Sequence, residues 1–365
     1  MEPSFFPQID PMGSASSAAI FSTSVVPDVL ELCRKVIARE AADVDTNGVK
    51  RRTLEALAAV HACGITVPTE FGGLNADVAV QREVAELLAG SDASTWFCWA
   101  QHHTPTRVAI DAGATELATK FARGELLAGV AFAHVRRPGT PNPIATRIDG
   151  GWSITGTLDW VTGWDVIDRV LIVISAPDED VYVHAFIEPI PAPGLEIGEP
   201  LALLAMGGTH TRPISMTEFV VPDETVVALV DRGQWHARDD ITVSAVSPAV
   251  FGLIRACVAE LSVGGMQRTD RGARDLATEF ATHATELRKA AYGCTDVAQN
   301  LVYRAQALSL VERATDAVVN MYAGASMRAG HPAGRRMREA RFLMVQAQTK
   351  ASRAAWSANE LTSFP

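Results

Sequence analysis

The chain has 365 residues, of which 48% are hydrophobic and 20% are charged, and its formal net charge is −10. This length allows more than one packed domain, and the acidic balance excludes the basic surface that neutralises nucleic-acid phosphates. The five cysteines form no CxxC pair, which indicates reduced thiols of a cytoplasmic protein rather than a zinc site or a disulfide framework. We also expect no signal peptide and no membrane span, because a basic start and a run of about 18 apolar residues are both missing.

The first part of the chain predicts helices. Residues 1–24 are rich in Ser, Pro and Ala and are expected to be a flexible segment. Residues 25–125 predict an N-terminal helical domain, because apolar residues recur at the spacing of one helix face. After a first helix near Pro27, further helices are expected at about 49–63, 76–89, 93–102 and 114–123. Between the first two of these, residues 64–74 read GITVPTEFGGL and predict a loop.

The apolar period changes to two in residues 126–230, which predicts a middle antiparallel β-barrel or sandwich domain. Its strands are expected at about 128–135, 144–148, 152–158, 166–174, 181–187 and 215–221. Residues 231–365 return to helical spacing and predict a C-terminal four-helix bundle. Its helical pieces are expected at about 241–264, 270–293, 296–327 and 335–361. The expected fold class is therefore α+β.

The stretch 150–175 holds two predicted strands around the turn Trp160-Val161-Thr162-Gly163. Residues two apart on a strand face the same side. Trp160 and Thr162 can therefore present a flat indole and a hydroxyl to one planar, redox-active ring. From the residues alone the alternative is a core tryptophan beside a turn threonine, since tryptophan is commonly buried.

Several segments resemble motifs of the acyl-CoA dehydrogenase superfamily, and they occur in the same order as in that family. Residues 64–74 resemble its loop G-(L/I)-x-x-P-x-x-(Y/F)-G-G-x-G, and residues 150–162 resemble G-x-x-x-x-x-G-x-K-x-W-I-T. The remaining matches are 124–125 (its G-E), 219–222 (its VP exit from the β domain), 315–324 (A-x-D-A-x-Q-x-x-G-G) and 331–340 (P-x-x-R-x-x-R-D-A).

The resemblance implies a flavin held between the β domain and the helical bundle. It places Trp160 against the isoalloxazine ring and Thr162 near the ring atom N5. It also implies a homo-oligomer, either a dimer or a homotetramer. The implied cofactor is FAD, with FMN as the alternative, because the diphosphate and adenine motifs are incomplete. Their nearest equivalents are Arg271, Asn320 and Gly324.

The family motif T-E-P-x-A-G-S-D, which lines flavin and substrate, is replaced here by residues 132–139. The resemblance makes Phe132, His134 and Val135 candidate cofactor contacts. His134 either serves the flavin, as a donor or an acid–base group, or is an ordinary satisfied side chain. Thr349 matches the threonine that follows the catalytic glutamate in ordinary members and is a further candidate contact.

The catalytic base of the family has no counterpart at its usual place. Aligned without gaps, the position of the glutamate that removes the α-proton is Ala347, which cannot accept a proton. Some members supply the glutamate from the first helix of the bundle, and the matching residues 245–248 also lack a carboxylate. Asp239 and Asp240 come shortly before, either as catalytic groups or as charges paired with a helix dipole. The catalytic residue is therefore unknown.

Two further groups of residues leave alternatives open. Five arginines, Arg328, Arg335, Arg336, Arg338 and Arg341, either grip the phosphates of CoA or flavin or form salt bridges. His102 and His103 with Trp96 and Trp99 either line an acyl pocket or belong to a packed helix. No His, Asp or Glu cluster has metal-ligand spacing.

The sequence thus predicts a flavin-dependent oxidoreductase that acts on CH–CH groups. The reaction would be α,β-dehydrogenation of a small-molecule substrate, an acyl-CoA or a similar thioester. One alternative is a reduced-flavin-dependent monooxygenase of the same fold, which needs no such base. Another is a non-catalytic subunit that pairs with an active homologue in a hetero-oligomer.

Overall fold

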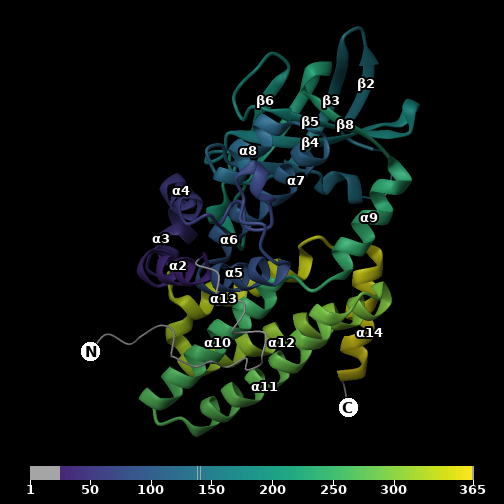
Figure 1. Ribbon diagram of the computed structural model, residues 1–365. Helices are drawn as coiled ribbons and strands as arrows, with labels where there is room; N and C mark the ends of the chain where they lie inside the picture. The colour runs from purple at the N-terminus through teal and green to yellow at the C-terminus, as the bar shows by residue number, and fades with distance from the viewer. Residues whose placement is uncertain (1–24, 138, 140, 364–365) are drawn as a thin grey trace.

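The computed structural model describes residues 25–137, 139 and 141–363. The flexible segment predicted for residues 1–24 lies outside this described part. The described chain has a β domain at one end, a bundle of long helices at the other, and N-terminal helices beside the junction (Figure 1). The predicted α+β class is confirmed.

The N-terminal helices are short and closely connected. They are α2 (Val25–Leu32), a π-helical segment η1 (Cys33–Ile37), α3 (Ala38–Asn47), α4 (Arg51–Ala59), the 3-10 turn η2 (Thr69–Phe71), α5 (Val78–Ser91), α6 (Ala93–Gln101), α7 (His103–Asp111) and α8 (Thr115–Arg123). Asp77 and Asp92 begin α5 and α6, because each carboxylate accepts a backbone N–H of the first turn. Gly124 ends α8 in the left-handed conformation, at a φ of +68°.

The β domain is one eight-stranded sheet rather than a wholly antiparallel barrel. Its strands are β1 (Ala128–Ala131), β2 (Ile144–Ile148), β3 (Gly151–Val161), β4 (Arg169–Ala176), β5 (Val181–Ile187), β6 (Leu195–Ile197), β7 (Arg212–Pro222) and β8 (Val226–Asp231). The order is β6-β7-β3-β2-β4-β5-β8, and β1 pairs with β4. Both β1 and β2 run parallel to β4, so the sheet is mixed. A 3-10 turn, η3 (Ala133–Arg136), replaces the second half of the first predicted strand.

The C-terminal helices are α9 (Arg232–Ser244), α10 (Pro248–Gln267), α11 (Arg271–Gly293), α12 (Val297–Tyr322), the 3-10 turn η7 (Ala323–Met327), α13 (Pro332–Val345) and α14 (Lys350–Ser363). The predicted helix at 335–361 is thus two helices, broken where Gln346 is extended and Ala347 has a φ of +49°. Likewise Pro248 begins α10 after a break that the sequence prediction missed. Helix α9 leads from the sheet to the bundle, where α9 and α14 both pack against α12 (Figure 1).

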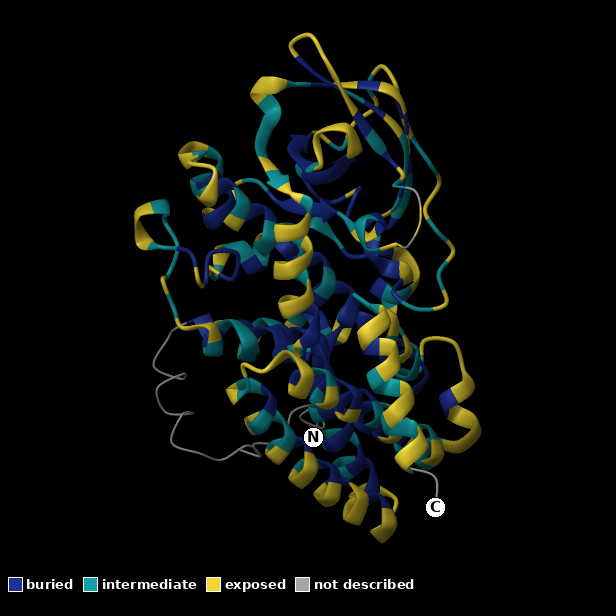
Figure 2. Cartoon of the chain, turned by 90° about the vertical axis from the view of Figure 1, so that its right-hand side faces the viewer, coloured by how far each residue is buried: buried dark blue, intermediate teal, exposed yellow. Residues whose placement is uncertain are grey.

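Burial explains the apolar character of the bundle. The stretch Arg232–Gln267 is long and apolar enough to cross a membrane by composition, yet 67% of its most apolar window is buried inside the structure. Figure 2 shows buried residues in the interior and exposed residues along the outer faces of the helices. The apolarity of α10 is therefore that of a central core helix.

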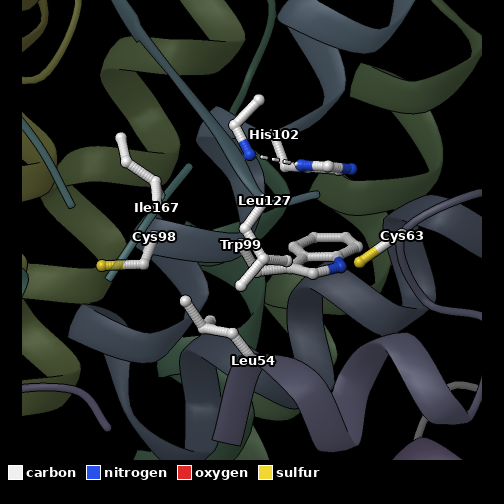
Figure 3. A pocket seen from close by; sticks show the side chains of 8 residues that line it. Leu54, Cys63, Cys98, Trp99, His102, Leu127 and Ile167 are labelled. Atoms are coloured by element: carbon white, nitrogen blue, oxygen red, sulfur yellow. Dashed lines mark hydrogen bonds between the residues drawn. The ribbon is translucent and has the colours of Figure 1, made fainter. Parts of the chain in front are cut away.

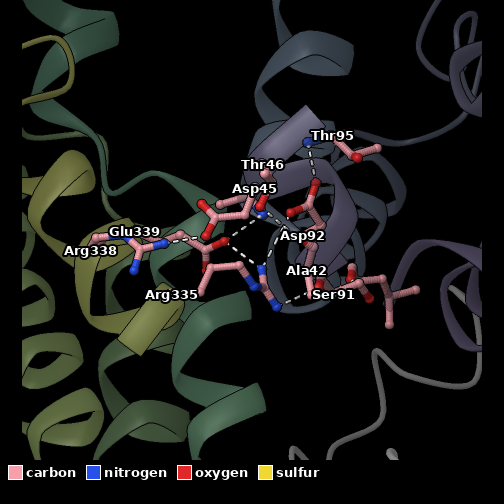
Figure 4. A network of polar contacts seen from close by, with 11 residues as sticks. Ala42, Asp45, Thr46, Ser91, Asp92, Thr95, Arg335, Arg338 and Glu339 are labelled. Carbon is pink, nitrogen blue, oxygen red and sulfur yellow. Dashed lines mark hydrogen bonds and ion pairs between the residues drawn. The ribbon is translucent and has the colours of Figure 1, made fainter. Parts of the chain in front are cut away.

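Buried charges join the N-terminal helices to α13. The guanidinium of Arg335 lies 3.4 Å from Asp92 and 2.5 Å from Glu339, and all three side chains are buried (Figure 4). Arg336 pairs with Glu260, Arg338 with Asp45, and Arg341 with Glu312. These four arginines form salt bridges, as one of the two interpretations expected.

Removal of the buried cation should be costly. Arg335→Met leaves Asp92 and Glu339 buried without a counter-charge, and we expect a loss of about 3–5 kcal/mol in the free energy of unfolding. Arg341→Met removes a half-exposed partner of Glu312 and should cost no more than about 1 kcal/mol. Urea unfolding of both variants measures the difference, and similar small losses would contradict a structural role for the network.

Candidate functional site

Trp160 lies near the end of β3 and exposes an unusually large apolar surface. Trp160 is 47% exposed, in a part of β3 that pairs with β7, beyond the last residue of β3 paired with β2, Thr155. An irregularity in the β3–β7 register between Leu158 and Val161 changes how this part of the strand is aimed. Arg137, just after η3, pairs with Asp159 and so ties η3 to the strand beside the indole. The indole face is thus available to a planar ligand.

Thr162 is buried, at 5% exposure, in contrast to Trp160. The strand ends at Val161, so the expected common face of Trp160 and Thr162 does not continue through Thr162. The Thr162 hydroxyl lies 3.4 Å from that of Thr211, which is 2.8 Å from that of Thr209. These contacts connect the Thr162 hydroxyl, through Thr211, to the hydroxyl of Thr209.

The loop that carries Thr209 and Thr211 was missed by the sequence interpretation. It contains two non-glycine residues with positive φ, Met206 at +63° and His210 at +50°. Thr209 donates to the carbonyl of Met206 at 2.7 Å, which stabilises the turn. A signal was present, since the sequence GGTHT at 207–211 combines glycines with closely spaced hydroxyls.

His134 is a buried, hydrogen-bonded side chain at the base of η3. Its Nε2 lies 2.8 Å from the carbonyl of Val173, so this nitrogen donates and carries the proton. Burial lowers the pKa of His134 to about 4. At neutral pH the ring is therefore uncharged, and its Nε2–H already donates a hydrogen bond to the carbonyl of Val173 in β4.

Phe132 and Arg136 connect η3 to α9. The Phe132 ring contacts Trp235 edge-on at 5.9 Å between centroids, and the Arg136 guanidinium lies 4.7 Å from the Phe132 ring centre. Arg136 donates two hydrogen bonds to Asp239, at 2.7 and 2.6 Å. Asp239 is thus engaged in a bidentate ion pair. Val135 packs on the apolar cluster between the sheet and α7–α8.

Arg304 of α12 was not singled out by the sequence, yet it occupies the centre of the junction. It is 8% exposed and donates from Nη1 to the carbonyl of Val243 and from Nη2 to that of Gln346, the latter at 2.6 Å. These carbonyls belong to the C-terminal ends of α9 and α13. Burial, and next the nearby charge of Arg136, lowers the pKa of Arg304 to about 10, so the side chain stays cationic at neutral pH.

Thr349 caps the last helix. Its backbone N–H donates to the Ser352 hydroxyl at 2.8 Å, and its own hydroxyl accepts from the Ser352 backbone N–H at 3.2 Å. The arm between α13 and α14 therefore has two fixed points, Arg304 at Gln346 and this cap at Thr349. Ala347 lies between them.

The residues predicted to bind the cofactor phosphates and adenine lie elsewhere in the chain. Asn320 comes 16 residues after Arg304 on α12, which is roughly 24 Å along the helix. Arg271, with an 86% exposed side chain, begins α11 and lies 3.5 Å from Asp275. Gly324 is exposed in η7. The structure thus groups Phe132, His134, Val135, Trp160 and Thr162 in the β domain and leaves these three apart.

His102 and its aromatic neighbours form packed structure rather than an acyl pocket. The ring Nδ1 of His102 accepts from Ala128 N–H at 3.0 Å, and Nε2 donates to the Phe121 carbonyl at 2.9 Å. Trp99 donates to Ala62 at 2.9 Å. The cavity beside them is about 10 Å³, room for one water molecule (Figure 3). Among the described residues no group of three His, Cys, Asp or Glu side chains is placed to hold a metal ion.

Comparison with known proteins agrees with this architecture. The model of the acyl-CoA dehydrogenase N-terminal domain matches residues 24–125. A probable acyl-CoA dehydrogenase of Mycobacterium leprae is 29% identical over 62% of this chain and 63% of its own length. The mitochondrial isovaleryl-CoA dehydrogenase of Solanum tuberosum is 23% identical over 94% of this chain and 93% of its own length.

The solved structure of PigA with FAD and proline has the same fold, with a TM-score of 0.75 at 13% identity, over 97% of this chain and 99% of that one. The order of domains and the matched sequences define one class of protein. Residues 24–125 match the N-terminal domain of acyl-CoA dehydrogenases, and the chain as a whole is similar to members of that superfamily in sequence and fold.

The burial of His134 predicts a pH dependence of stability. The unfolded chain takes up a proton near pH 6.5, but folded His134 does so only near pH 4, so stability is complete above pH 6.5 and falls as the pH is lowered. His134→Gln keeps a donor for Val173 and cannot titrate. Between pH 7 and pH 5 the wild type should lose about 2 kcal/mol more than this variant. Urea unfolding at both pH values, with His283→Gln as an exposed control, measures this; equal losses would contradict a buried neutral His134.

Proposed function

We propose that the protein is a flavin-dependent oxidoreductase whose flavin ring lies against Trp160, between the β domain and the bundle. The single observation that carries this proposal is the exposed Trp160 indole at the end of a paired strand, next to the junction formed by η3 and α9. The similarity to acyl-CoA dehydrogenases supports an oxidoreductase that acts on an acyl-CoA or a similar thioester at a CH–CH bond. We place it in the cytoplasm as a homo-oligomer, a dimer or a tetramer.

The residues at the junction suit a flavin in their chemistry. The indole of Trp160 offers a flat stacking surface, and the Thr162 hydroxyl can exchange its long 3.4 Å contact with Thr211 for a hydrogen bond to the ring. A bound flavin supplies a two-electron acceptor at this position. His134, neutral and bonded to β4, supports η3 behind the site.

FAD rather than FMN is the proposed form of the cofactor. The phosphates and adenine of FAD then need binding residues beyond those that contact the flavin ring. Arg271, Asn320 and Gly324 lie at the end of the bundle far from Arg304. For these residues to contact the phosphates or adenine of the same cofactor, a second copy of the chain has to provide them. FAD binding and oligomer formation are therefore one linked proposal, whereas FMN would need neither.

The base for α-proton removal is unassigned. Ala347 has no carboxylate, residues 245–248 have none, and Asp239 is held by Arg136. These observations favour a second candidate, a reduced-flavin-dependent monooxygenase, because such an enzyme does not need a base at this position. A non-catalytic subunit that pairs with an active homologue is a third outcome, which the tests below distinguish.

Trp160 should matter for flavin affinity. Trp160→Ala removes the stacking surface, and we expect the Kd for flavin to rise about 10-fold, while Trp160→Phe should lose less. Val220→Ala, an exposed apolar residue on the neighbouring strand β7, is the control and should leave the Kd unchanged. Titration with FAD and with FMN, followed by flavin fluorescence, gives both affinities. Equal Kd values for the alanine variants would place the flavin elsewhere.

Anaerobic reduction separates the candidate activities. For a dehydrogenase, acyl-CoA added without oxygen should bleach the visible absorbance of bound flavin, because two electrons pass to the ring. A monooxygenase should show no bleaching, but chemically reduced protein should consume oxygen and form a hydroxylated product. A colourless protein that binds no added flavin would overturn the oxidoreductase proposal and leave the non-catalytic subunit.

A further inference from the structure

Two segments that can carry the catalytic glutamate in the superfamily meet at one side chain in this protein. Ala347 follows Gln346, whose carbonyl accepts from Arg304, and residues 245–248 follow Val243, whose carbonyl accepts from the other terminal nitrogen of Arg304. Both segments lack a carboxylate. The side chain that joins the two segments is instead the buried guanidinium of Arg304.

The charge of Arg304 is not neutralised by another side chain. Within the described residues no carboxylate forms an ion pair with Arg304, and the charged side chain that lowers its pKa, after burial, is the cation of Arg136. Arg136 has its own bidentate partner in Asp239. The buried arginines of α13 differ in this respect, since Arg335 lies between Asp92 and Glu339.

Two of the five N–H groups of Arg304 are used by the carbonyls, which leaves three donors of the planar guanidinium. A guanidinium fork matches a carboxylate in shape and charge. A buried cation without a counter-ion is costly, and a ligand anion removes that cost when it binds.

We propose that Arg304 binds a carboxylate of the substrate, so that the acyl group carries a second, anionic carboxyl group near the carbon to be oxidised. This inference rests on the proposed function for the identity of the site, and it adds the substrate class. The position follows from Ala347, because the guanidinium reaches the residue directly before the place from which a base would act on that carbon.

A purely structural role is the competing explanation. The carbonyls of Val243 and Gln346 end two helices, and helix C-termini attract cations. In that case Arg304 would hold the two helices together and would not distinguish between ligands. The two explanations predict a different dependence of binding on the charge of the ligand. This charge can be varied without changing the protein.

The test compares two acyl groups of nearly the same shape. Malonyl-CoA ends in a carboxylate where isovaleryl-CoA ends in two methyl groups. We expect the wild-type holoprotein to bind malonyl-CoA about 10- to 100-fold more tightly, the usual effect of one hydrogen-bonded charge. Calorimetric titration gives both Kd values, and free malonate is titrated in parallel so that the result does not depend on the CoA group.

Variants on α12 assign the effect to Arg304. Arg304→Gln keeps donors for the carbonyls but not the charge, and should remove the preference for malonyl-CoA. Arg304→Lys should keep part of it. Arg313→Gln, on the same helix and exposed, is the matched control and should leave both Kd values unchanged. If the glutamine variant does not fold, the reduced preference of the Arg304→Lys variant relative to the wild type assigns the effect, and an unchanged preference contradicts it.

Each outcome separates this inference from the proposed function. Equal binding of the two thioesters by a yellow protein, or malonate binding that is the same in the Arg304→Gln variant, overturns the carboxylate site and leaves the flavoprotein proposal standing. No binding of any of the three probes overturns the site as well. A colourless protein that binds malonate only when Arg304 is present supports the site while the flavoprotein proposal fails.

Discussion

The contact of Arg304 with two helix ends is the constraint on which the rest of the junction depends. The guanidinium donates to the carbonyl of Val243 in the last turn of α9, which carries partial negative charge, and to the carbonyl of Gln346, the extended residue directly after α13. This explains how a buried cation is tolerated without a carboxylate. It also fixes where the arm after α13 lies relative to α9, and Arg136 with Asp239 then fixes η3 and the β domain against the same helix.

Much of the fold could be predicted from the sequence, because periodicity is a local property. Strand β5 lies where the alternation of apolar residues places it, and α11 follows its predicted range closely. The errors fall where local pattern and tertiary pairing disagree. The first strand was predicted through Val135, but β1 ends at Ala131 and the chain turns into η3 beside β4. Strand β6, of three residues, is too short to show a period.

The site was less predictable, because its contacts join segments that are far apart in the sequence. Nothing in the local sequence around His134 indicates that Val173, on another strand, uses its Nε2–H. An arginine in an alanine-rich helix gives no sign of whether it will be exposed like Arg313 or buried like Arg304. The family motif locates Ala347 at the position where a catalytic carboxylate is expected. Only the three-dimensional arrangement shows that Arg304 contacts the residue before it.

The missing carboxylate at Ala347 and the buried guanidinium of Arg304 concern the same arm of the chain. If a carboxylate at position 347 pointed toward the guanidinium of Arg304, the cation would lower its pKa. Such a carboxylate would be a poor acceptor for an α-proton, since a general base works best with a pKa near the operating pH. A site with Arg304 in this position is therefore suited to hold an anion and poorly suited to generate a carbanion. The chemistry of this protein therefore has to be explained with an alanine at position 347 and a buried guanidinium bonded to the residue before it.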